Sequence, residues 1–175
     1  RLQVEHGVTE QVWGVDLVRW MIELAAGTLP PLATLRDTLK PKGHAIQARI
    51  YAENPGRQFQ PSPGLLTDVA FPPDDRVTLR IDSWVEAGCE VPPFFDPMLA
   101  KMIAWQPTRE AAIRVLHSAL GETRLYGVET NRSYLQQILT FAPFAAGEPW
   151  TRCLEHLMYQ ASTLEVLSAG TQTTV

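Results

Sequence analysis

The 175-residue sequence has few cysteines, no basic run and no long apolar stretch, and each absence excludes a class of protein. Cys89 and Cys153 lack metal-ligand spacing, which indicates free thiols in a reducing compartment and a cytoplasmic location. The formal net charge is −4 without a Lys/Arg cluster, so no nucleic acid is expected as a partner. No stretch approaches the length of a membrane span, so no membrane is expected either.

Two further absences concern catalysis. The sequence has no glycine-rich phosphate loop and no acidic cluster suited to Mg2+. His44 has no neighbours that complete a metal set, so no metal ligand is expected. The length suits one domain with a substantial core. The chain lacks an initiator methionine and starts inside a motif, so we expect a piece of a longer protein.

The most informative stretch is RLQVEHGVTE at positions 1–10. Arg1, Gln3 and Glu5 alternate with Leu2 and Val4, which predicts a strand running into a helix start. A guanidinium suits a small oxyanion, an amide can donate or accept a hydrogen bond, and a carboxylate can take a proton. The set fits binding and deprotonation of a small anion such as bicarbonate. The alternative is an ion pair on an exposed strand.

Hydrophobic periodicity and turn residues predict the remaining elements. Short strands between many prolines favour a small antiparallel sheet or barrel with packed helices, an α+β fold. Thr108 and Asn131 are expected to cap helices, and Asp74-Asp75 to form a turn. The expected strands are 43–51, 65–71, 77–81, 98–105 and 123–126; the expected helices are 16–26, 108–120, one from 131, and 151–159, with 28–41 a connection.

Arg49 is a charge in a mostly apolar strand, where alternation places it on the face opposite Ile46, Ala48 and Ile50. Such a charge indicates a ligand or a carboxylate partner. Asp96 is the candidate ion-pair partner, and Glu53 is another.

The motif R-x-Q-V-E-H-x-V-T-E resembles the signature of the biotin carboxylase family, ATP-grasp enzymes that carboxylate biotin. Gly7 stands where the family usually has proline. The resemblance continues through GHAIQARIYAENP (43–55), PSPG (61–64), VPPFFDPMLAKMI (91–103) and YGVETN (126–131). It implies that residues 1–160 are the C-terminal region of a biotin carboxylase, with the corresponding domain fold.

The resemblance also implies residue roles. In the family, MgATP phosphorylates bicarbonate, and the ureido nitrogen of biotin captures the carbon dioxide that carboxyphosphate releases. Arg1, Gln3 and the backbone of Val4 would hold bicarbonate, Glu5 would be the general base, and Arg49 would stabilise the negative oxygen of the biotin enolate. The ATP and Mg2+ sites lie upstream in the family. The chain would therefore hold half of an active site and be inactive alone.

The last stretch, TLEVLSAGTQTTV (163–175), is similar to the opening of the domain that follows biotin carboxylase in urea carboxylases and urea amidolyases. Those enzymes convert urea to allophanate. Residues 161–175 would then be a linker and the start of a carboxyltransferase-type domain; a disordered tail is the alternative. The implied partners are the upstream ATP-grasp region, a biotin carrier domain, the carboxyltransferase domain and, as an option, a second copy in a homodimer.

Other interpretations stay open. The chain could be a structural, dimerisation or carrier-docking module, or the same domain from an acyl-CoA or pyruvate carboxylase. It could also be a biotin carrier, because Ala100-Lys101-Met102 resembles part of the Met-Lys-Met turn that holds biotin. Leu99 and Ile103 flank that lysine and indicate a buried strand instead of an exposed hairpin tip, which disfavours the carrier interpretation.

Overall fold

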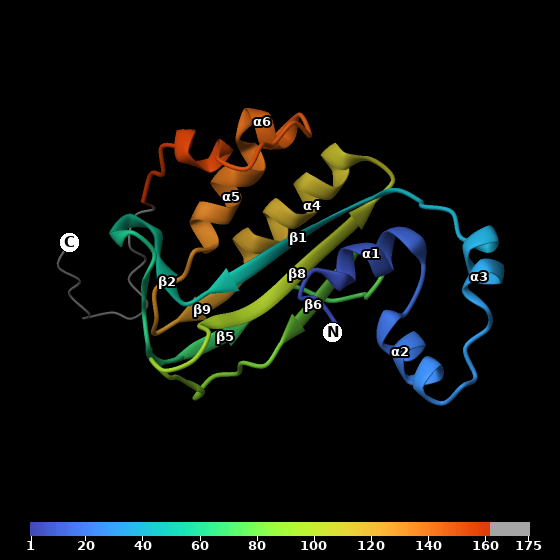
Figure 1. The fold of residues 1–175 in the computed structure, drawn as a ribbon. Helices are drawn as coiled ribbons and strands as arrows, with labels where there is room; N and C mark the ends of the chain where they lie inside the picture. Colours follow the sequence, from blue (N-terminus) through green and yellow to red (C-terminus); the bar gives the residue numbers. More distant parts are fainter. Residues whose placement is uncertain (162–175) are drawn as a thin grey trace.

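The computed structural model describes residues 1–161, and its centre is a three-stranded antiparallel sheet in the order β1-β8-β6 (Figure 1). These strands are β1 (His44–Tyr51), β8 (Met98–Gln106) and β6 (Leu79–Ser83). The β1–β8 pairing runs from His44↔Gln106 to Tyr51↔Met98 and shifts register between Ile50 and Tyr51. Because β8 is central, one edge of β1 pairs with no strand of this sheet.

One face of the sheet carries the hydrophobic core. Its buried side chains alternate along β1 and β8, as the period of two requires: Ile46, Ala48, Ile50, Ala100, Met102 and Ala104. Helix α4 (Arg109–Glu122) packs on this face, and α5 (Arg132–Thr140) packs on α4 (Figure 1). Thr108 caps α4 as predicted, since its Oγ1 accepts a hydrogen bond from Ala111 N at 3.2 Å.

The opposite face carries α1 (His6–Trp13), which contacts β1 and β8. Helices α2 (Leu17–Ala25) and α3 (Leu32–Thr38) follow and lie to one side of the sheet (Figure 1). Asp16 caps α2 by accepting a hydrogen bond from Arg19 N at 2.8 Å. The chain then returns through residues 39–43 to begin β1.

The remaining strands form small antiparallel pairs, and the α+β prediction is confirmed. The pairs are β2 (Glu53–Asn54) with β3 (Gln60–Pro61), β4 (Gly64–Leu65) with β7 (Glu90–Val91), and β5 (Asp68–Ala70) with β9 (Arg124–Tyr126). Three short helical segments complete the described chain: η1 (Pro55–Arg57), α6 (Ala142–Ala145) and η2 (Cys153–His156). No helix within residues 1–161 is long and apolar enough to cross a membrane.

Several predicted elements differ from the structure. Residues 1–5 form no strand; a turn at Val4–Glu5 leads directly into α1. The expected connection 28–41 contains α3, and the expected helix 151–159 is only the 3-10 segment η2. Helix α4 continues through Gly121 to Glu122. The predicted interdomain stretch from 162 onward lies outside the described residues, so the 1–160 and 161–175 boundary stays a prediction.

Candidate functional site

The candidate site lies where the turn before α1 meets β1. Glu5 Oε2 accepts a hydrogen bond from Arg49 Nη2 at 2.8 Å, which joins residues 44 positions apart. The side chains stay partly open, with 56% of Glu5 and 37% of Arg49 exposed. Glu5 Oε1 has no hydrogen-bond partner within residues 1–161, so it is available to a ligand. A carboxylate and a guanidinium therefore face solvent together, as proton transfer from a small anion requires.

Hydrogen bonds to backbone carbonyl groups hold the same turn in place. Gln3 O accepts hydrogen bonds from His6 N at 3.2 Å and from His6 Nδ1 at 2.6 Å. Val4 O accepts one from Lys101 Nζ at 3.3 Å. The N–H groups of Val4 and Glu5 donate to no group in the described part of the chain. Unpaired backbone N–H groups beside a guanidinium suit an anion.

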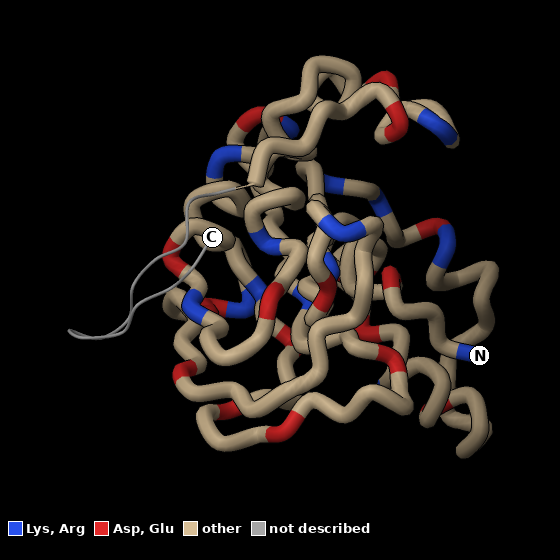
Figure 2. The backbone as a smooth tube through the Cα atoms, turned by 90° about the vertical axis from the view of Figure 1, so that its left-hand side faces the viewer, with Lys and Arg blue, Asp and Glu red and all other residues tan. Residues whose placement is uncertain are grey.

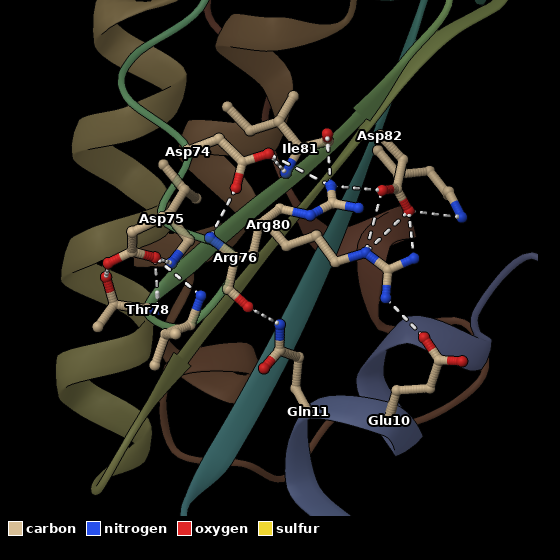
Figure 3. A network of polar contacts seen from close by, with 12 residues as sticks. Glu10, Gln11, Asp74, Asp75, Arg76, Thr78, Arg80, Ile81 and Asp82 are labelled. Atoms are coloured by element: carbon tan, nitrogen blue, oxygen red, sulfur yellow. Dashed lines mark hydrogen bonds and ion pairs between the residues drawn. The ribbon is translucent and has the colours of Figure 1, made fainter. Parts of the chain in front are cut away.

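Lys101 connects this turn to a buried charge network. Its Nζ lies 3.3 Å from Asp82 Oδ2. Arg80 donates to both oxygens of Asp82 and, through Nη1, to Glu10 Oε2 at 2.6 Å (Figure 3). Glu10 is 9% exposed, and its Oε1 accepts from Leu17 N at 2.8 Å. The network thus fixes α1 and the start of α2 against β6 and β8.

The electrostatics of this network keep its central pair ionised. The hydrogen bond to Asp82, aided by one to Glu10, raises the pKa of Arg80 although burial opposes the shift. Burial alone would raise the pKa of Asp82, but the charges of Arg80 and Lys101 outweigh it and hold that pKa below its usual value. The pair therefore keeps its charges near neutral pH.

Asp74 and Asp75, predicted as a turn, lie in an irregular segment before β6, and bends follow at residues 76–78 (Figure 3). Asp75 Oδ1 accepts hydrogen bonds from Thr78 N at 2.7 Å and from Leu79 N at 3.0 Å. These contacts, with one from the Thr78 hydroxyl, lower the pKa of Asp75. Gln11 donates to the carbonyl of the neighbouring Arg76 at 3.1 Å, which adds a contact between α1 and this segment.

The predicted site residues are only partly brought together. Glu5 and Arg49 pair directly, and Val4 lies in the same turn. Arg1 and Gln3 are exposed, and their side chains make no hydrogen bond within the part of the chain that the structure describes.

The expected pairing of Arg49 with Asp96 is wrong. Arg49 pairs with Glu5, while the Asp96 carboxylate turns to the start of β8 and accepts a hydrogen bond from Met98 N at 3.0 Å. Within residues 1–161 no ion pair joins Glu53 to Arg49. Neither alternative carboxylate therefore serves as the partner of Arg49.

Two residues near the site were not predicted as site residues, and the sequence carried little signal for them. Lys101 lies in the middle of β8, directly opposite Arg49, with 12% of its side chain exposed. It is not at a hairpin tip, as a biotin-bearing lysine would be. Asn131 was expected only as a helix cap, but its side chain bonds to β1 at Arg49 and Tyr51.

Biotin and MgATP, the groups that the resemblance implies, make different demands on the residues around the Glu5 turn. Arg49 offers a half-exposed guanidinium with only Nη2 bound to Glu5, which fits the ureido oxygen of biotin. Within residues 1–161 no group of three or more His, Cys, Asp or Glu side chains could hold a metal ion.

The chain is similar in sequence and in structure to known proteins. The family model for the biotin carboxylase C-terminal domain matches residues 47–156. The urea amidolyase of Saccharomyces cerevisiae is 42% identical over 175 residues, which are 100% of this chain and 9% of that protein. The structure of Kluyveromyces lactis urea carboxylase matches with a TM-score of 0.83 at 43% identity, over 91% of this chain and 14% of that one.

A further solved structure was determined with ligands. It is the biotin carboxylase domain dimer of Hydrogenobacter thermophilus 2-oxoglutarate carboxylase, in complex with MgADP, ADP and bicarbonate. It matches with a TM-score of 0.83 at 34% identity, over 92% of this chain and 36% of that one. The chain therefore spans a minor part of each of these proteins.

Proposed function

The chain belongs to the biotin carboxylase family as its C-terminal domain, and from this premise we propose that it supplies the bicarbonate- and biotin-binding residues of an ATP-dependent biotin carboxylase. The similarity to urea amidolyase and urea carboxylase over the whole chain supports a parent enzyme that carboxylates urea. The ATP and Mg2+ sites belong to other parts of that parent.

The observation that carries the proposal is the Glu5–Arg49 pair at 2.8 Å. Arg1, Gln3 and the unpaired N–H of Val4 bind bicarbonate beside it. Glu5 accepts the bicarbonate proton on its free Oε1 while the bicarbonate oxygen attacks the γ-phosphoryl group of ATP, and the bond to the β–γ bridging oxygen breaks to release ADP. Holding Glu5 in place matters here, because a positioned base contributes only when it lies within hydrogen-bond reach of the proton.

Arg49 acts at the second substrate. Biotin, when bound, supplies the ureido nitrogen that takes up the carboxyl group. The guanidinium donors of Arg49 that Glu5 leaves unbound meet the ureido oxygen as it gains negative charge. A donor fixed in advance stabilises such charge more than water does, because it needs no reorganisation. The residues of β1 that orient Arg49 therefore belong to the machinery for carboxylating biotin.

The proposal includes contact with the rest of the polypeptide. No residue of α2 is buried, although the helix has an apolar character. Val18, Met21, Ile22 and Leu24 are 43% to 66% exposed. Exposed apolar area of this kind commonly marks an interaction surface. The ATP-grasp region of the same enzyme is the proposed partner of this face; the carrier and carboxyltransferase domains and a second copy are proposed partners elsewhere.

Two substitutions in the full-length enzyme test the division of labour. Glu5→Gln should abolish bicarbonate-dependent ATP cleavage and biotin carboxylation together, because the amide has no basic oxygen. Arg49→Ala should keep slow bicarbonate-dependent ATP cleavage but lower carboxybiotin formation by about 100- to 1,000-fold, the usual effect of removing one donor to a developing oxyanion. ADP release and carboxybiotin are measured side by side.

Arg124→Ala is the matched control. Arg124 also lies on a strand and pairs with a carboxylate, Asp68, at 2.9 Å, but away from the site. It should leave both activities unchanged. If Arg49→Ala and Glu5→Gln lose both activities in equal proportion, the proposed roles are wrong. An equal loss with a lower melting temperature would instead favour the structural or docking module.

A further inference from the structure

We propose that Asn131 is a positioning residue that orients Arg49 by binding the open edge of β1. The inference rests on the role proposed above for Arg49. Asn131 Nδ2 donates a hydrogen bond to Arg49 O at 3.2 Å, and Asn131 Oδ1 accepts one from Tyr51 N at 3.0 Å. Asn131 N also donates to Tyr51 O at 3.1 Å. Three hydrogen bonds from one residue thus hold the end of the strand that carries Arg49.

The geometry of the strand explains why these groups need a partner. In an antiparallel sheet, the N–H and C=O groups of residues i and i+2 point to the same side. Arg49 O and Tyr51 N point away from β8, toward the edge where no strand of this sheet pairs. The side-chain amide of Asn131 takes the place that the peptide group of a neighbouring strand would occupy.

Asn131 contacts β1 where the pairing between β1 and β8 is irregular. The β1–β8 register shifts between Ile50 and Tyr51, one residue beyond Arg49. A bulge locally disrupts the ladder and bends the strand, which re-aims the nearby side chains. Asn131 binds Arg49 O before this irregularity and Tyr51 N after it. Asn131 therefore fixes the direction of the end of β1, which the pairing with β8 alone does not fix.

The Asn131 side chain uses both of its amide atoms to bind β1. Asn131 occupies the N-cap position of α5, where an asparagine usually bonds to the helix backbone, yet it makes no capping hydrogen bond. It is 7% exposed, and both of its amide atoms are satisfied by β1. A buried amide with both atoms bonded to one strand specifies a single geometry.

Loss of this amide should act mainly on the biotin step. Arg49 Nη2 reaches Glu5 Oε2 at 2.8 Å, so a tilt of the strand end displaces the guanidinium from the position where it meets biotin. A displacement of about 1 Å at a reacting centre can lower the rate by about 100-fold. Asn131 makes no hydrogen bond to the turn at residues 3–5, so it reaches the bicarbonate step only through the Arg49–Glu5 pair, and ATP cleavage should fall no further than in Arg49→Ala.

The experiment compares Asn131→Ala and Asn131→Asp in the full-length carboxylase. We expect carboxybiotin formed per ATP cleaved to fall by about 10- to 100-fold, with the KM for bicarbonate unchanged. The aspartate keeps the acceptor for Tyr51 N but turns an oxygen toward Arg49 O, so it should not rescue. In an Arg49→Ala background, Asn131→Ala should lower this ratio no further, because Asn131 acts through Arg49.

Thr123→Val is the matched control. Thr123 is 1% exposed, and its hydroxyl donates to Ala119 O at 2.8 Å and lies 3.7 Å from Met102 Sδ on β8, but it makes no hydrogen bond to Arg49 or Tyr51 within the described residues. It should lower stability without changing the ratio of carboxybiotin to ATP cleaved. If Asn131→Ala lowers both activities in proportion, as the control does, or lowers the ratio further in the Arg49→Ala background, the inference is overturned.

A crystal structure of the Asn131→Ala enzyme separates this inference from the proposed function. We expect the Arg49–Glu5 pair to move apart from 2.8 Å; an unchanged pair overturns the inference. If Arg49→Ala fails to separate the two activities, the proposed role of Arg49 fails, and the crystal structure still decides whether Asn131 orients it. If Arg49→Ala separates them and Asn131→Ala does not, the inference alone fails.

Discussion

At the scale of single residues, one buried ion pair holds the site together. Arg80 and Glu10 have 17% and 9% of their side chains exposed, and they join β6 to the helix that follows the Glu5 turn. Removing one partner of such a pair leaves a charge buried without compensation, which costs more than the pair itself contributes. The stability of the turn therefore depends on residues that touch no substrate.

Arg80→Met should lower the free energy of unfolding by about 3–5 kcal/mol, because Glu10 and Asp82 would both lose their main cation. Chemical denaturation of the purified chain measures this change. Arg36→Met is the control, since the Arg36–Asp37 pair has 81% and 71% of its side chains exposed. Exposed pairs of this kind contribute little, so no measurable change is expected there. Equal effects of the two substitutions would contradict the role given to Arg80.

At the scale of elements, a glycine in α1 allows the helix to lie close to the sheet. Gly7 is buried, and a Cβ atom added at this position would overlap Ile103 Cδ1 on β8. Ile103 is fully buried and has little room to move. The approach of α1, and with it the position of the Glu5 turn, is thus set by the absence of a side chain at position 7.

Gly7→Ala and Ile103→Val should therefore be coupled. Alanine gains up to about 1 kcal/mol in helix propensity, but the overlap with Cδ1 costs about 1–3 kcal/mol. Ile103→Val removes that methyl group, so Gly7→Ala should be more favourable by about 1 kcal/mol or more in the valine background. Thermal or chemical unfolding of the four variants measures the coupling. Gly121→Ala in α4 is the control and should be additive with Ile103→Val.

Most elements with a strong hydrophobic period were predictable from the sequence, including β1, β8, α2 and α4. The strand expected at residues 1–5 is absent, because contacts from His6 and Lys101 hold the carbonyls of Gln3 and Val4 in a turn. Helix α3 was missed because two prolines precede it. Pro31 at its N-cap leaves the helix free to start, since no intrahelical donor is needed there.

The candidate site was predictable in its residue types but not in all its partners. The turn at residues 4–5 and β1 each contribute a predicted residue, Glu5 and Arg49. The choice of Glu5 over Asp96 depends on how α1 packs on the sheet, which sequence spacing does not encode. Asn131 looked like a helix cap for the same reason, because the open edge of β1 exists only in the folded chain.

At the scale of the whole molecule, core and site occupy opposite faces of one sheet. Helices α4 and α5 lie on the core side, while α1 and the Glu5–Arg49 pair lie on the other (Figure 1). Lys and Arg are interspersed with Asp and Glu along the chain in Figure 2. The domain thus presents local charge pairs around its site, and one side of the sheet can serve chemistry while the other maintains the fold.

This division predicts the behaviour of the 175-residue chain on its own. We expect a cooperative thermal transition, because the core needs only β1, β8 and the helices packed on them. We also expect no bicarbonate-dependent ATP cleavage, because the proposed function assigns the ATP and Mg2+ sites to other parts of the parent enzyme. Circular dichroism and ADP release measure the two properties on one sample. Clear ATP turnover by the folded chain, abolished by Glu5→Gln, would show that the half-site proposal is wrong. If the chain unfolds cooperatively and shows no turnover, the missing activity reflects absent catalytic groups and not an unfolded domain.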